Sequence, residues 1–353
     1  MADPISSPQV NMHSVRHNLL KRYFKINPSV YYFDFGASII VGWVAFGFAV
    51  VKSNHLLIWG LATIVATFAI YRAVMFTHEL AHFHNNKMRT FNWIWNAACG
   101  IPLLVPSFFY HGVHNEHHFR GTFSTSGDGE YLPFGRPPRF TMYSYLASNF
   151  FLPSLLIIRF TILGPLSWLS PHARDWVWRR VSSLSIDFSY QRSVPTPTPK
   201  LWLVQETLCS IYIWILVLLV VYGILPAMII IEWHIVGISI LLLNAFRTLV
   251  AHRYTNAGGT TTFDEQIADS INITGGSILT PLLAPVGLRY HGLHHVFPVI
   301  PYHNLGAAHR NLMKNLPDDA AYQQTLFRTF LHAFRLLWRN SGGKLPSSEA
   351  TLP

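Results

Sequence analysis

The sequence predicts an all-α membrane protein with four transmembrane helices arranged in two hairpins. Half of its 353 residues are hydrophobic and only 12% are charged, whereas a soluble domain carries about 25% charged residues. Four apolar runs are long enough to cross about 30 Å of hydrocarbon. The basic residues fall in the connections on one side of these runs, which is typical of a multi-pass integral membrane protein.

The four runs form two pairs with very short connections. Residues 33–51 and 56–76 are joined by the polar segment 52–55, and residues 202–225 run directly into residues 226–250. Three other apolar segments are interrupted by proline, glycine or arginine, or are too short to span: 91–110, 143–169 and 277–288. We expect these three to form interfacial or re-entrant helices, with one additional crossing as the alternative.

Four crossings leave residues 1–32, 77–201 and 251–353 on one side of the membrane. Of the 26 Lys and Arg residues, only Lys52 lies in a loop on the other side. This asymmetry places the three segments, and with them both termini, in the cytoplasm. We therefore expect one domain, residues 1–353, with a cytoplasmic cap on a membrane stem and a disordered tail from about residue 341.

Several classes of protein are disfavoured by the same observations. The net charge of +10 would suit nucleic acid, but the basic residues lie between apolar runs, so we expect a lipid bilayer and no nucleic acid as partner. Cys99 and Cys209 lie within apolar runs and form neither a disulfide framework nor a thiolate metal site. No apolar run follows a basic N-terminal stretch, so no cleaved signal peptide is predicted.

Histidines cluster in the segments assigned to the cytoplasm. Three groups have helical spacing: His78 and His82; His114, His117 and His118; His291, His294 and His295. Residues i and i+4 of a helix share a face, whereas adjacent residues point about 100° apart, so one helix can reach two metal ions. A ninth candidate is His252, which follows the fourth crossing much as His78 follows the second. These two helices should therefore pack side by side.

Eight or nine imidazoles exceed the needs of a single zinc ion, which takes three or four ligands. An imidazole-rich site without thiolates suits two iron ions that react with O₂. His84 and His111 are weaker candidates for metal ligands. Hydrogen-bonding partners should orient the ligand rings, and the candidates are Glu79, Glu116, Thr248, Glu265 and Asp269.

Two other interpretations remain for these histidines. The segment HELAH, His78 to His82, fits the H-E-x-x-H signature of zinc metalloproteases. Intramembrane zinc proteases pair that signature with an aspartate in a later membrane segment, and the later crossings contain no aspartate. A non-catalytic membrane protein that stores or transports metal is the second interpretation. A transporter should carry ionisable residues inside its crossings, and few are present here.

Taken together, HELAH, HNEHH and HGLHH resemble the three histidine boxes of the membrane fatty acid desaturase superfamily. Their order and the two crossings between the second and third boxes also match, and the resemblance covers about residues 31–316. The segment PYHNLGAAHRNLM is similar to bacterial acyl-lipid members. The resemblance implies a non-haem di-iron centre, a tunnel for a lipid tail, and His252 as a further ligand. Thr248 replaces an asparagine that holds a metal-bound water in some animal acyl-CoA members.

The resemblance implies desaturation of a fatty acyl chain, with O₂ as co-substrate and the di-iron centre as the catalytic group without a separate protein base. Hydroxylation of a lipid, alkane or carotenoid is the alternative. The substrate would be an acyl lipid, an acyl-CoA or an acyl-carrier protein. A ferredoxin or cytochrome b5-type carrier would supply electrons, because the chain has no flavin or haem motif. The basic cytoplasmic face would attract such an acidic carrier, or anionic lipid headgroups.

Overall fold

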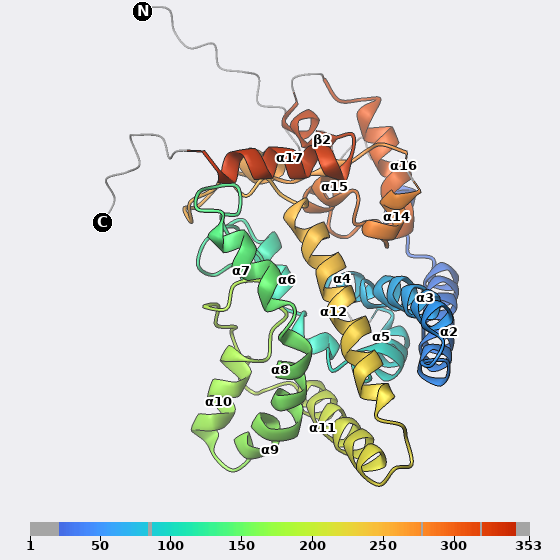
Figure 1. The fold of residues 1–353 in the computed structure, drawn as a ribbon. Coiled ribbons are helices and arrows are strands. Elements are labelled where there is room, and N and C mark those ends of the chain that lie inside the picture. Colours follow the sequence, from blue (N-terminus) through green and yellow to red (C-terminus); the bar gives the residue numbers. More distant parts are fainter. Residues whose placement is uncertain (1–20, 84–86, 277, 318–319, 344–353) are drawn as a thin grey trace, which may run out of the picture.

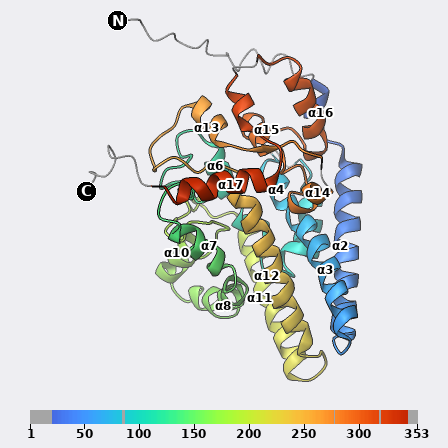
Figure 2. The same ribbon diagram turned by 45° about the horizontal axis from the view of Figure 1, so that its top comes forward.

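The structure, a computed structural model, describes residues 21–83, 87–276, 278–317 and 320–343. Within these ranges, four helices are long and apolar enough to cross a membrane: Pro28–Val51 (α2), Leu56–Ala81 (α3, Leu56–Val74, continued by α4, Phe76–Ala81), Lys200–Val221 (α11) and Met228–Leu249 (α12). They extend in a common direction from a cap of shorter elements (Figures 1 and 2). The predicted fold class is confirmed, and the predicted helix ends differ from the observed ones by a few residues.

Close packing within and between the hairpins positions the ends that face the cap. On α2, Gly42 lets the two helices of the first hairpin approach, because a Cβ atom there would lie only 2.6 Å from the Ile70 side chain. Helix α12 packs against α3, and the buried Glu232 carboxylate accepts hydrogen bonds from Trp59 Nε1 at 2.8 Å and Thr63 Oγ1 at 2.7 Å. The expected side-by-side packing of the second and fourth crossings is thus confirmed.

The three other apolar segments form short helices. Residues 91–110 fall in α5 (Arg89–Trp95), η2 (Asn96–Gly100) and η3 (Ser107–Phe109). Residues 143–169 fall in α7 (Phe140–Ser148), α8 (Leu152–Ile158), η4 (Arg159–Leu163) and α9 (Gly164–Ser167). A bend of 53° separates α7 from the following helices, and the bent pair has the length and composition of either a broken crossing or a re-entrant loop. Residues 278–288 include only the short α14 (Leu279–Leu283).

Helix α10 (Pro171–Arg180) packs against α9 (Figure 1). The cap contains the other elements: η1 (Lys21–Phe24), α6 (Val113–His118), α13 (Phe263–Asp269), α15 (His291–Val296), α16 (Tyr302–Met313), η5 (Ala321–Thr325) and α17 (Phe330–Ser341). Strands β1 (Asn272–Ile273) and β2 (Leu326–Phe327) pair in parallel. One cluster of buried apolar side chains joins the membrane helices to the cap. Helix α17 continues to Ser341, and residues 344–353 of the predicted tail lie outside the described residues.

Candidate metal centre

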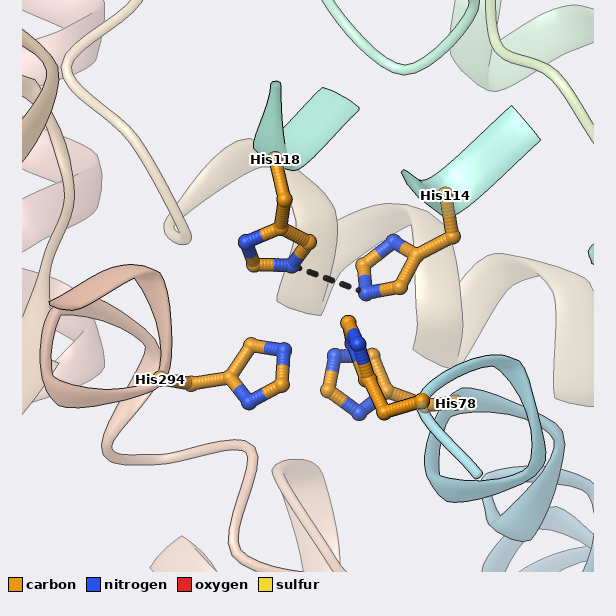
Figure 3. Close-up of side chains that lie close together, drawn as sticks. His78, His114, His118 and His294 are labelled. Atoms are coloured by element: carbon orange, nitrogen blue, oxygen red, sulfur yellow. Dashed lines mark hydrogen bonds between the residues drawn. The ribbon is translucent and has the colours of Figure 1, made fainter. Parts of the chain in front are cut away.

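The nine predicted ligand histidines come together in two groups. Within each group, every histidine offers one ring nitrogen, and these atoms lie within 4.8 Å of one another. The first group contains His78, His82, His114, His118 and His294, and the second contains His117, His252, His291 and His295. Figure 3 shows four members of the first group, whose rings are turned toward one another from α4, α6 and α15.

The helical repeat divides each box of three histidines between the two groups. On α6, His114 and His118 are four residues apart and join the first group, whereas the intervening His117 joins the second. On α15 the pattern is reversed, because the outer pair joins the second group and His294 joins the first. Side chains four residues apart share a face, and adjacent side chains diverge by about 100°. Each of the two boxes therefore serves both groups.

The backbone of the third box packs tightly against Asn272 of β1. A Cβ atom at Gly292 would lie 2.8 Å from the Asn272 side-chain nitrogen, so glycine allows α15 to approach β1. The same asparagine accepts from the Leu293 backbone N–H at 3.1 Å and donates to Thr325 Oγ1 at 2.6 Å. The glycine of HGLHH thus has a packing role, and the asparagine fixes the start of the helix that carries the histidines.

The donor set fits metal ions that prefer imidazole. Burial, followed by the neighbouring histidines, lowers the pKa well below its ordinary value for His114, His118, His291, His294 and His295. Among the described residues, neither ring nitrogen of the buried His78 or His294 has a hydrogen-bond partner. In both groups, Nε2 atoms of different rings face each other at 2.8 to 3.2 Å. Lone pairs that converge in this way are stabilised by a cation, and imidazole suits iron, zinc and copper.

Three carboxylates hold the outward-facing ring nitrogens. Asp128 Oδ2 lies 2.9 Å from His117 Nδ1, Glu130 Oε1 lies 3.0 Å from His114 Nδ1, and Asp269 Oδ2 lies 3.2 Å from His252 Nδ1. Such partners fix the tautomer and orientation of a metal-bound imidazole. Burial lowers the pKa of His117, but the charge and hydrogen bond of Asp128, together with the charges of Glu130 and Asp269, outweigh burial, and the net shift is upward.

Asp128 and Glu130 are missing from the sequence-based prediction. They lie in the irregular loop between α6 and α7, in the segment GDGE, 11 and 16 residues after the histidines that they contact. The available signal was their position as the first acidic residues after the second box. Asp269, which was predicted, lies at the end of α13, and the adjacent Ser270 forms an antiparallel bridge with His252.

The other predicted partners have different contacts. Glu79 accepts hydrogen bonds from the Tyr31 hydroxyl and, at 3.1 Å, from the Tyr302 backbone N–H, and its carboxylate lies 4.0 Å from His78 Nδ1. It therefore connects the first box to α2 and α16. Thr248 lies in a cavity wall and accepts from Arg247 Nη2 at 3.2 Å.

For Glu116 and Glu265 the prediction is corrected. Glu116 accepts from the Tyr190 hydroxyl at 2.5 Å. Glu265 is exposed and forms a capping box with Thr262 at the start of α13, which satisfies backbone N–H groups at the helix end. The exposed His111 is outside both histidine groups, and its backbone carbonyl accepts from Arg192 Nη2 at 2.9 Å. His84 lies outside the described residues.

A cavity of about 170 Å³ adjoins the two histidine groups. Four of the histidines contribute to its wall: His78, His117, His252 and His291. Apolar side chains from the membrane helix α12 and the short helix α8 line another part, including Pro153, Leu156, Trp233, Ile240 and Leu241. The cavity can therefore hold an alkyl chain that extends from the histidines toward the interior of the helix bundle.

Two comparisons with known proteins agree with this geometry. The family model described as "Fatty acid desaturase" matches residues 53–327. A ceramide hydroxylase of Caulobacter vibrioides (strain NA1000 / CB15N) is 35% identical over 298 residues, which cover 84% of this chain and 85% of the relative. No solved structure matches the chain significantly. Because the matched region contains all three histidine boxes and His252, the chain belongs to the fatty acid desaturase family, a family of oxidoreductases that act on lipids.

Proposed function

We propose that this protein hydroxylates a long-chain lipid of the ceramide class, using O₂, two histidine-bound iron ions and electrons from an external carrier. The similarity to a ceramide hydroxylase over 84% of the chain carries this proposal. The relative's reaction favours hydroxylation over the desaturation that the sequence suggested. Desaturation of an acyl chain is the second candidate, because the family model bears that name.

The histidine groups and the cavity suit such a reaction. Two iron ions held by the nine histidines would supply the O₂ chemistry needed to attack an unactivated C–H bond. In balance, one O₂, two electrons and two protons convert C–H into C–OH and water. Asp128, Glu130 and Asp269 keep three of the ligand rings in the orientation that presents Nε2 inward. The apolar wall excludes water and holds the alkyl chain beside the histidines.

The same proposal includes the side of the membrane and the source of electrons. The cap lies on the side where the Lys and Arg residues are concentrated, so we place it in the cytoplasm. A small acidic carrier of the ferredoxin or cytochrome b5 type would be attracted to this basic face, and its binding should weaken as the salt concentration rises.

The test is lipid analysis of a host that expresses the full chain and is supplied with N-acyl sphinganine under isotopically heavy O₂. Hydroxylation adds one heavy oxygen atom, whereas desaturation removes two hydrogen atoms and adds no oxygen. The His117→Ala variant should give neither product. The His55→Ala variant, altered in the exposed turn between α2 and α3, should match the unaltered protein. A new double bond without incorporated oxygen would establish the second candidate instead.

A further inference from the structure

The cavity beside the histidines changes in character along its length. Residues of α12 from Trp233 to Thr248 line it, a stretch of roughly 22 Å at 1.5 Å per residue. In the first half of α12, Trp233 Nε1 donates to the Pro102 carbonyl at 2.9 Å, and near the middle of the helix Gly237 faces Pro153 of α8. Apolar side chains surround this part. The last turn of α12 leads directly to His252 and the second histidine group.

Polar side chains gather at the histidine end. They come from two parts of the chain that line the cavity: Tyr145 in α7 and Asn149 just after it, and Asn244, Arg247 and Thr248 at the end of α12. Tyr145 and Asn149 are buried, and the asparagine donates its side-chain N–H to the Tyr145 carbonyl at 2.7 Å. A chain oxidised in the middle of its alkyl tail would not need hydrogen-bonding groups at this position.

Arg247 is the unusual member of this set. Its Nη2 atom donates to the Asn244 side-chain oxygen at 3.0 Å and to Thr248 Oγ1 at 3.2 Å. Across the described part of the chain, no carboxylate lies within 4.0 Å of its guanidinium. Glu130 also lines the cavity, but its carboxylate accepts from Tyr110 and contacts His114. Arg247 is thus a half-buried cation whose hydrogen-bond partners Asn244 and Thr248 are neutral. The charge of Glu130 acts on it only from beyond 4.0 Å, so an acceptor atom supplied by a ligand would stabilise the guanidinium.

We propose that Arg247 binds an oxygen atom at the polar end of the substrate, so that oxidation occurs within a few bonds of a hydroxyl or amide group. This inference rests on the proposed function and specifies the substrate as an N-acyl amino alcohol. The guanidinium presents several N–H donors in a fixed plane, which suits carbonyl and hydroxyl oxygens. With the polar end held there, the alkyl chain would extend along α12 toward Trp233.

The experiment compares the full chain with Arg247→Met and Arg247→Lys variants. The control is Arg179→Met, which alters an exposed arginine paired with Asp175 on α10. N-acyl sphinganine, its analogue without the 3-hydroxyl group, and the free fatty acid are the probes. Lipid binding is measured as the rise in unfolding temperature, product position by fragmentation mass spectrometry, and metal content by elemental analysis.

For N-acyl sphinganine, Arg247→Met should lower kcat/KM about ten- to a hundredfold, as expected for one hydrogen bond to a charged group. It should also spread the hydroxyl over several carbons while the metal content stays unchanged. Arg247→Lys should restore part of the selectivity. The unfolding temperature should rise less on lipid addition in Arg247→Met than in the other proteins, a readout that needs no turnover.

Unchanged lipid binding and product position in Arg247→Met would overturn the inference. A preference of the unaltered protein for the free fatty acid over N-acyl sphinganine would also overturn it. Loss of metal from Arg247→Met would also overturn it, because the residue would then support the histidines. If no protein hydroxylates any probe but N-acyl sphinganine binding still depends on Arg247, the proposed function fails while the binding site stands.

Discussion

Replacing Asp128 with asparagine should weaken metal binding in the second histidine group and spare the first. The aspartate is fully buried, and its two oxygens accept from His117 Nδ1, from the Ser124 N–H at 2.9 Å and from the Glu130 N–H at 2.9 Å. In the variant, one oxygen becomes an NH₂ group that faces a backbone N–H. The loss of one charge-assisted hydrogen bond is worth about 1.5–3 kcal/mol, which agrees with a 10- to 100-fold loss of metal affinity on removing such a partner.

The assay is an anaerobic titration of the purified, metal-free chain with Fe(II) in competition with a chelator. The expected result is one site of unchanged affinity and one weakened by about 10- to 100-fold. Asp175→Asn, at an exposed residue of α10, should leave both sites unchanged. Glu130→Gln should weaken the other site, because its histidine, His114, belongs to the first group. Two unaltered sites in Asp128→Asn, or equal weakening of both, would refute the reasoning.

Two further predictions concern chain length and stability. Gly237→Leu should fill the apolar part of the cavity next to Pro153 and shift selectivity toward shorter acyl chains. Each methylene group that is no longer buried costs about 0.8 kcal/mol, or about fourfold in selectivity. Competition between lipids of different chain length measures this shift, and unchanged selectivity would contradict the prediction. Glu206 is buried and contacts two arginines, Arg159 and Arg174, each at 2.5 Å. Glu206→Gln should therefore destabilise the fold by about 3–5 kcal/mol, whereas the exposed control Asp175→Asn should cost less than about 1 kcal/mol, as compared by thermal unfolding in detergent.

The elements that follow a regular repeat could be predicted from the sequence. The four membrane helices follow from the length of the apolar runs, and the division of His117 and His118 between two groups follows from the helical repeat. The partners of the histidines were harder to predict. Asp128 reaches His117 through an irregular loop whose path has no repeat, so spacing along the chain does not indicate the contact.

Local rules could have removed two wrong candidates. Glu116 is two residues from both His114 and His118 on the same helix, so its side chain points about 200° away from theirs, and it points about 100° away from that of the adjacent His117. Glu265 is the last residue of the pattern Thr262-x-x-Glu265, which is the sequence signature of a capping box. In both cases the sequence contained the geometry that the structure shows.

The histidines could be predicted and two of their carboxylate partners could not, because helices carry the histidines and a loop carries Asp128 and Glu130. Helix α3, continued by α4, packs side by side with helix α12. This packing brings His78, in the first histidine group, close to His252, in the second. The Glu232 carboxylate braces the same two helices near their other ends. Helices thus position the candidate ligand rings, whereas a loop supplies the carboxylates of Asp128 and Glu130 that contact two of them. We therefore expect substitutions in the loop to change metal affinity without moving the helices, and substitutions in the helices to change which histidines can reach the metal.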